Sequence, residues 1–165
     1  MKEYNSKFKI VQALLFLLIP IILWAINGFV LLDSISAYAK YTPMTFALSL
    51  GLSGALFMYD GFGEKNRWYN IYIGASLFGV VLFSMYDHKI IHYTFATIFF
   101  IGSLFNMVYF SSSKERWFKI ITVIGVLIGM MGTFVFDWYS IFFAEWIGML
   151  PISIHYILEL THKID

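Results

Sequence analysis

The sequence predicts an all-α integral membrane protein, a bundle of six transmembrane helices. Two observations support this fold class. The 165 residues are 60% hydrophobic and only 13% charged, and six apolar runs follow one another with short connections. Soluble domains carry about 25% charged residues, and a chain this small could not hide so much apolar surface from water. We therefore expect residues 1–165 to form a single domain whose solvent is lipid.

The predicted helices cover roughly residues 10–32, 44–59, 68–86, 91–110, 117–136 and 138–160. Most approach the ~20 residues that a helix needs to cross ~30 Å of hydrocarbon. The second run is short, which indicates either a start nearer Tyr41 or a locally thinner bilayer. The first run is too long for the apolar part of a typical signal peptide, so we expect it to be retained as a helix.

The basic residues predict the orientation. Only Lys40 and Lys89 fall in the first and third connections. The remaining basic residues lie in the tails and the even-numbered connections, or close to them: Lys2, Lys7, Lys9, Lys65, Arg67, Lys114, Arg116, Lys119 and Lys163. Cytoplasmic segments carry the excess of Lys and Arg, so both termini are predicted to be cytoplasmic. A multi-pass protein of a bacterial inner membrane, or of an equivalent membrane, fits this pattern.

Small residues recur in three of the predicted helices. Gly125, Gly129 and Gly132 lie in the fifth helix, the first two in G-x-x-x-G spacing, and Gly54 and Gly74 lie in the second and third. Glycine lets helices approach closely where lipid gives no hydrophobic drive for association. The fifth-helix glycines therefore predict either packing within the monomer or a homodimer seam.

Ionisable and polar residues fall into two layers along the helices, given a rise of ~1.5 Å per residue. Such residues inside a bilayer normally face the bundle interior and find partners. The predicted outer cluster, at the external end, consists of Asp87, His88, His92, Asp137 and Glu145, with Trp146 beside it. The predicted inner cluster consists of Asp60, Asn106 and His155.

The outer cluster has three possible interpretations. It is a structural polar lock, such as His92 bonded to Glu145, or a site that holds a lipid headgroup or does acid/base chemistry on one. Alternatively it binds zinc, because His88 and His92 lie one helical turn apart and a carboxylate is available. For His155 we expect a hydrogen bond to Asn106 or to a backbone carbonyl.

Two stretches carry a family resemblance. One is Asp87-His88-Lys89-Ile90-Ile91-His92-Tyr93-Thr94-Phe95-Ala96 with the following Phe99-Phe100-Ile101-Gly102, and the other is Phe143-Ala144-Glu145-Trp146. From about Thr45 onward the chain resembles the DRAM/Frag/Sfk family of six-helix membrane proteins. The resemblance implies cytoplasmic termini and a lipid-related role, and it carries over to His92, Glu145 and Trp146. The first external connection departs from the family, because it is short here.

The favoured function is lipid handling or membrane modulation through the outer cluster, with membrane lipid as the partner. One alternative is a metal-dependent intramembrane hydrolase that uses zinc on His88 and His92. Another is an accessory subunit that docks a larger membrane protein through its glycine-lined fifth helix. The chain has no Cys, which excludes disulfides and thiolate metal sites. Its net charge of +1 gives no reason to expect nucleic acid.

Overall fold

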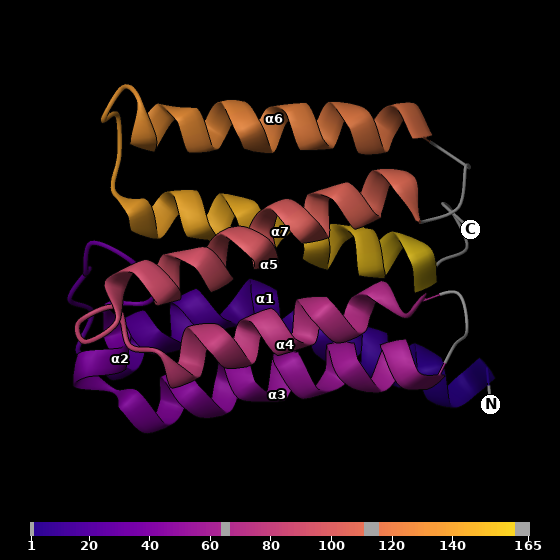
Figure 1. Cartoon of the computed structure of the whole chain (residues 1–165), viewed down its shortest axis with the longest axis horizontal. Coiled ribbons are helices and arrows are strands. Elements are labelled where there is room, and N and C mark those ends of the chain that lie inside the picture. The colour runs from indigo at the N-terminus through magenta and orange to yellow at the C-terminus, as the bar shows by residue number, and fades with distance from the viewer. Residues whose placement is uncertain (1, 64–66, 111–115, 161–165) are drawn as a thin grey trace.

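The computed structural model describes residues 2–63, 67–110 and 116–160, and it is helical, without strands in that part of the chain. Long helices lie side by side in one bundle (Figure 1). The elements are α1 (Lys2–Ile26), α2 (Tyr38–Tyr41), α3 (Pro43–Gly63), α4 (Tyr69–Leu82), α5 (Lys89–Tyr109), α6 (Arg116–Phe134) and α7 (Ile141–Leu160). The fold class is therefore the predicted all-α bundle.

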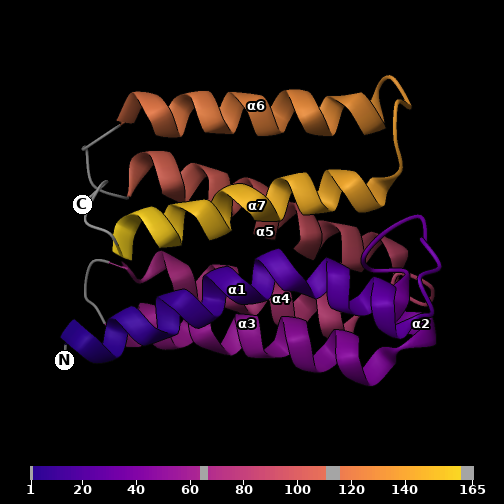
Figure 2. The same ribbon diagram turned by 180° about the vertical axis from the view of Figure 1, so that it is seen from behind.

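Among the described residues, four helices are long and apolar enough to cross a membrane. These candidate spans are Lys7–Ile26, Lys89–Tyr109, Arg116–Phe134 and Ile141–Glu159. Helix α3 and the shorter apolar α4 run alongside them between the same two ends of the bundle (Figures 1 and 2). This arrangement is that of a membrane protein, and the number of passes is taken up again below.

Both chain termini lie at one end of the bundle, here called the terminal end (Figure 1). The α1–α2, α4–α5 and α6–α7 connections lie at the other, here called the distal end. Lys40 and Lys89 belong to the distal end, whereas Lys9, Arg67 and Arg116 belong to the terminal end. Lys65, Lys114 and Lys163, which contribute to the charge asymmetry, lie outside the described residues.

The core lies where α1, α3, α5 and α7 meet. Phe16 is fully buried, and its ring centroid lies 5.7 Å from that of Phe57 and 5.6 Å from that of Phe99. Tyr156 also belongs to this aromatic group, and its ring centroid lies 5.9 Å from that of Phe57. Because lipid tails are as apolar as these rings, packing contacts rather than removal from water stabilise such a core.

Helices α3 and α4 approach each other closely at their glycines. A Cβ atom on Gly74 would lie 2.4 Å from the carbonyl oxygen of Gly54, so the two backbones touch. The expectation that these glycines permit close packing is confirmed.

The first helix ends earlier than the sequence predicts. Residues 10–32 were predicted to be helical, but α1 ends at Ile26. The Gly28 N–H donates to the Ala25 carbonyl and the Phe29 N–H to the Trp24 carbonyl, and Gly28 has a φ of +66°. This is a Schellman cap, for which glycine in the left-handed conformation is the usual residue. The apolar residues after it belong to the distal connection.

The other predicted boundaries also need correction. The second helix was predicted at 44–59, but it begins at Pro43 and continues to Gly63. The third, predicted at 68–86, ends at Leu82, where the α4–α5 connection begins. The first helix begins at Lys2, well before the predicted residue 10. The remaining boundaries differ by a few residues, which is normal at helix ends.

Candidate functional site

A pocket of about 510 Å³ opens at the distal end, between α2, the start of α3 and the α4–α5 connection. One part of its wall is polar and comes from Lys40, Ser84, Tyr86, Asp87 and His92. The other part is apolar and includes Pro43, Phe46, Val80 and Met85. The pocket is thus amphipathic. We call it the distal pocket.

Lys40 is held against the rings of neighbouring tyrosines. Its Nζ lies 5.5 Å from the centroid of the Tyr86 ring and 5.8 Å from that of Tyr41. A cation at this distance from an aromatic face is attracted by the ring quadrupole. The contact positions the ammonium group of an exposed side chain at the distal pocket.

His92 forms part of the pocket wall and joins α5 to the end of α4. Its side chain is only 2% exposed, and its Nδ1 lies 2.8 Å from the carbonyl oxygen of Phe83. A carbonyl accepts a hydrogen bond, so Nδ1 carries the proton. In the neutral ring, Nε2 is then an acceptor. The imidazole orientation is therefore fixed by the backbone at the C-terminus of α4.

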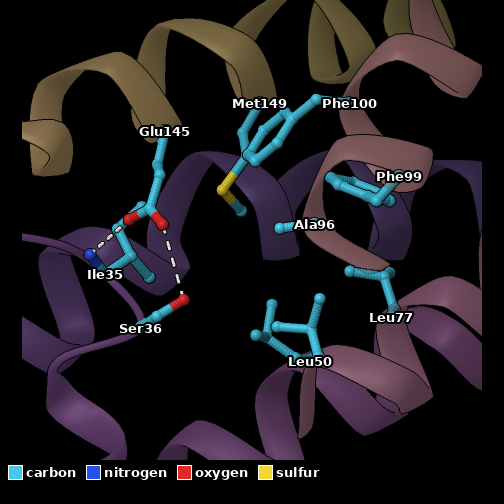
Figure 3. A pocket seen from close by; sticks show the side chains of 10 residues that line it. Ile35, Ser36, Leu50, Leu77, Ala96, Phe99, Phe100, Glu145 and Met149 are labelled. Carbon is cyan, nitrogen blue, oxygen red and sulfur yellow. Dashed lines mark hydrogen bonds between the residues drawn. The ribbon is translucent and has the colours of Figure 1, made fainter. Parts of the chain in front are cut away.

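Glu145 binds the backbone of the first distal connection. Its carboxylate accepts hydrogen bonds from the Ile35 N–H at 2.5 Å and from the Ser36 hydroxyl at 3.4 Å (Figure 3). The same connection is bound to the start of α7 by the Phe142 N–H, which donates to the Asp33 carbonyl at 2.7 Å. Glu145 therefore fixes the position of the residues that lead into α2.

Glu145 also borders a separate cavity of about 30 Å³. The other walls of this cavity are mostly apolar, with Leu50, Leu77, Phe99 and Met149 around it (Figure 3). A space of this size holds about one water molecule, and it is far too small for a lipid headgroup.

The predicted hydrogen bond between His92 and Glu145 is absent from the described structure. Each side chain instead binds backbone groups, His92 at Phe83 and Glu145 at Ile35. Both residues thus contribute to the distal end, but in different places. A sequence pattern of ionisable residues does not reveal a backbone partner, because every residue offers the same N–H and C=O groups.

The remaining residues of the predicted outer cluster are dispersed. Asp87 lines the distal pocket. His88 is exposed just before α5, with its ring edge-on to Phe83, and Asp137 is exposed in the α6–α7 connection. Trp146 packs against Phe142. Within the described residues, no three His, Asp or Glu side chains come together as metal ligands.

A buried charge network occupies the terminal end. Glu159 binds Lys9 at 2.9 Å and also binds Arg67, and Arg67 reaches Asp60 at 3.5 Å. Asn70 donates to the same carboxylate of Asp60 at 2.6 Å. Asp60 and Glu159 are 8% and 6% exposed. Among the described residues, two cations and two carboxylates thus compensate one another and join α1, α3 and α7, with Arg67 coming from the segment just before α4.

This network differs from the predicted inner cluster of Asp60, Asn106 and His155. Only Asp60 belongs to it. The described structure has no hydrogen bond between His155 and Asn106, and the His155 ring instead lies edge-on to Tyr156. Sequence reasoning missed Lys9 and Arg67 because it interpreted them only as topology signals. Glu159 follows His155 by four residues and so lies on the same helix face. This spacing could have predicted that Glu159 is buried.

The glycines of α6 mostly contact their own chain. A Cβ on Gly129 would meet Ile147 at 3.1 Å, and one on Gly132 would meet Tyr139 at 3.0 Å. The Tyr139 hydroxyl also donates to the Gly129 carbonyl. Gly125 has no described atom within 4 Å of such a Cβ. A homodimer seam stays a prediction, for which Gly125 is the glycine left open.

The sequence model of one protein family, described as a family of unknown function (DUF7103), matches residues 18–160. No curated protein and no solved structure matches the chain. The matched range includes the distal pocket and Glu145, together with most of the charge network.

Proposed function

The chain belongs to DUF7103, a family of unknown function, and we propose that it is a multi-pass membrane protein that binds a phospholipid headgroup in the distal pocket. The observation that carries the proposal is the composition of that pocket. It combines an ammonium group, a carboxylate, a hydroxyl and an imidazole with an apolar wall, at the end of a helical bundle. A headgroup and the first part of its acyl chains need both kinds of surface.

Lys40 is the residue proposed to bind the phosphate. A lysine ammonium is a compact point charge that suits a phosphate oxygen, and charge-assisted hydrogen bonds are stronger than neutral ones. The tyrosine rings beside Lys40 keep the ammonium at the pocket. His92 would add a fixed polar atom to the wall, and Glu145 would act indirectly, by holding the connection that leads to Lys40.

We also propose that all helices except the four-residue α2 cross the membrane, which gives six passes, with both termini in the cytoplasm. Support comes from the position of the two termini at one end (Figure 1) and from the charge asymmetry of the sequence. The distal pocket would then face the external leaflet. The resemblance to the DRAM/Frag/Sfk family favours the same role. The zinc hydrolase and the accessory subunit stay alternative predictions of the sequence.

The test is native mass spectrometry of the full chain titrated with phospholipid in mild detergent. Lys40→Ala should weaken binding about tenfold, the order of magnitude for one charge-assisted hydrogen bond. Lys89→Ala is the matched control, because Lys89 lies at the same end but does not line the pocket. Equal binding by wild type and both variants would refute the proposal.

A further inference from the structure

The charges that line the distal pocket indicate which headgroup it takes. We infer that the pocket selects a zwitterionic phospholipid with a primary ammonium group, of the phosphoethanolamine type, with its phosphate at Lys40 and its ammonium at Asp87. The inference rests on the proposed function and adds a substrate class to it.

The first step is charge complementarity. Among the described residues of the pocket wall, Lys40 and Asp87 carry formal charges of opposite sign. An anionic headgroup, such as phosphoglycerol, would pair with Lys40. It would bring no positive group to pair with the Asp87 carboxylate. Phosphoethanolamine has one charge of each sign, so it matches both side chains.

The second step separates a primary ammonium from a quaternary one. A carboxylate accepts hydrogen bonds from N–H groups, and choline has none to donate. Proteins recognise choline instead through several aromatic faces around the cation. In this pocket Lys40 already lies over the ring of Tyr86, which is therefore engaged by a cation of the protein itself. The described wall thus favours an ammonium that donates hydrogen bonds to Asp87.

The third step concerns the acyl region. Pro43, Phe46, Val80 and Met85 give the pocket an apolar wall next to its charged residues. A free phosphoethanolamine molecule would leave this wall without a partner, whereas a phospholipid would cover it. The ligand class is therefore a whole lipid rather than its soluble headgroup.

The experiment is a competition in native mass spectrometry between three phospholipids with identical acyl chains and ethanolamine, choline or glycerol headgroups. Wild type should favour the ethanolamine lipid about tenfold over the other two, as one additional charge-assisted hydrogen bond would produce. Asp87→Asn should abolish that preference. Asp137→Asn is the matched control, since Asp137 is exposed at the same end outside the pocket, and asparagine tolerates its left-handed backbone.

The outcomes separate the two proposals. Binding that depends on Lys40, but with no preference for the ethanolamine lipid or with a preference that survives in Asp87→Asn, would overturn the inference and leave the proposed function intact. Binding that is independent of Lys40 would overturn both. Free phosphoethanolamine that competes as well as the lipid would contradict the lipid as the ligand.

Discussion

Glu145 accepts a hydrogen bond of 2.5 Å from the backbone N–H of Ile35, a residue 110 positions earlier in the chain. This contact joins the last helix to the connection that follows the first. It gives a carboxylate inside an apolar helix a structural partner. It also positions the residues that lead to Lys40 and so connects the architecture of the distal end to its pocket.

Replacing Glu145 should therefore destabilise the protein. Glu145→Ala removes the acceptor and leaves a part-buried N–H of Ile35 without it, which costs about 1–3 kcal/mol. Glu145→Gln keeps one carbonyl oxygen as an acceptor and should lose less. The measurement is thermal unfolding of the purified protein in one detergent. Equal transition temperatures for wild type and Glu145→Ala would show that the contact contributes nothing to stability.

The charge network predicts a strong effect at Arg67. Arg67→Met removes the cation that pairs with the buried carboxylates of Asp60 and Glu159. Removing one partner of a buried ion pair costs about 3–5 kcal/mol of stability. Arg116→Met is the control, because Arg116 is exposed at the same end and should change stability by less than about 1 kcal/mol. Denaturant titration of both variants gives the comparison, and similar losses for the two would contradict a special role for the network.

Gly74 should tolerate no side chain. In Gly74→Ala the new Cβ would overlap the Gly54 carbonyl oxygen, whose distance is 2.4 Å, and overpacking of this kind costs about 1–3 kcal/mol. Gly125→Ala offers the contrast, since no atom of the described residues lies within 4 Å of a Cβ at Gly125 and alanine favours a helix. The expected order of thermal stability is Gly125→Ala at or above wild type, with Gly74→Ala below both. The reverse order would contradict the close contact of α3 and α4.

The proposed topology can be tested by labelling, because the natural chain has no cysteine. His88→Cys introduces a thiol in the distal connection, and Lys7→Cys introduces one at the terminal end. A membrane-impermeant maleimide should label the first variant in intact cells and the second only after lysis. Labelling of both variants in intact cells, or of Lys7→Cys alone, would contradict cytoplasmic termini.

The sequence predicted the helical bundle well because apolar runs of sufficient length have few alternatives in a membrane. The sequence-based prediction was wrong about where the first helix ends. The run from Phe29 to Leu32 is as apolar as the helix before it, and only the Schellman cap at Gly28 separates the two. The sequence correctly predicted close helix packing at Gly54 and Gly74, since a glycine has no side chain to keep two helices apart.

The candidate site was predictable only in part. The sequence placed His92 and Asp87 at one end of the bundle, and both residues line the distal pocket. That they bind a ligand stays a prediction. It did not identify the partners of Glu145, which are a backbone amide and a hydroxyl far away in the chain. Nor did it indicate that Lys40 lines the same pocket as Asp87, because this arrangement depends on how the α1–α2 and α4–α5 connections fold together.

The most direct test of the central claim is to find where a phospholipid headgroup binds. A phospholipid with a photoactivatable headgroup would be crosslinked to the wild-type protein in vesicles, and the modified peptides would be identified by mass spectrometry. We predict crosslinks concentrated in residues 39–47 and 80–92, and fewer of them in Lys40→Ala than in Lys89→Ala. Crosslinks concentrated at the terminal end, or spread evenly over the lipid-facing helices, would contradict a headgroup site in the distal pocket.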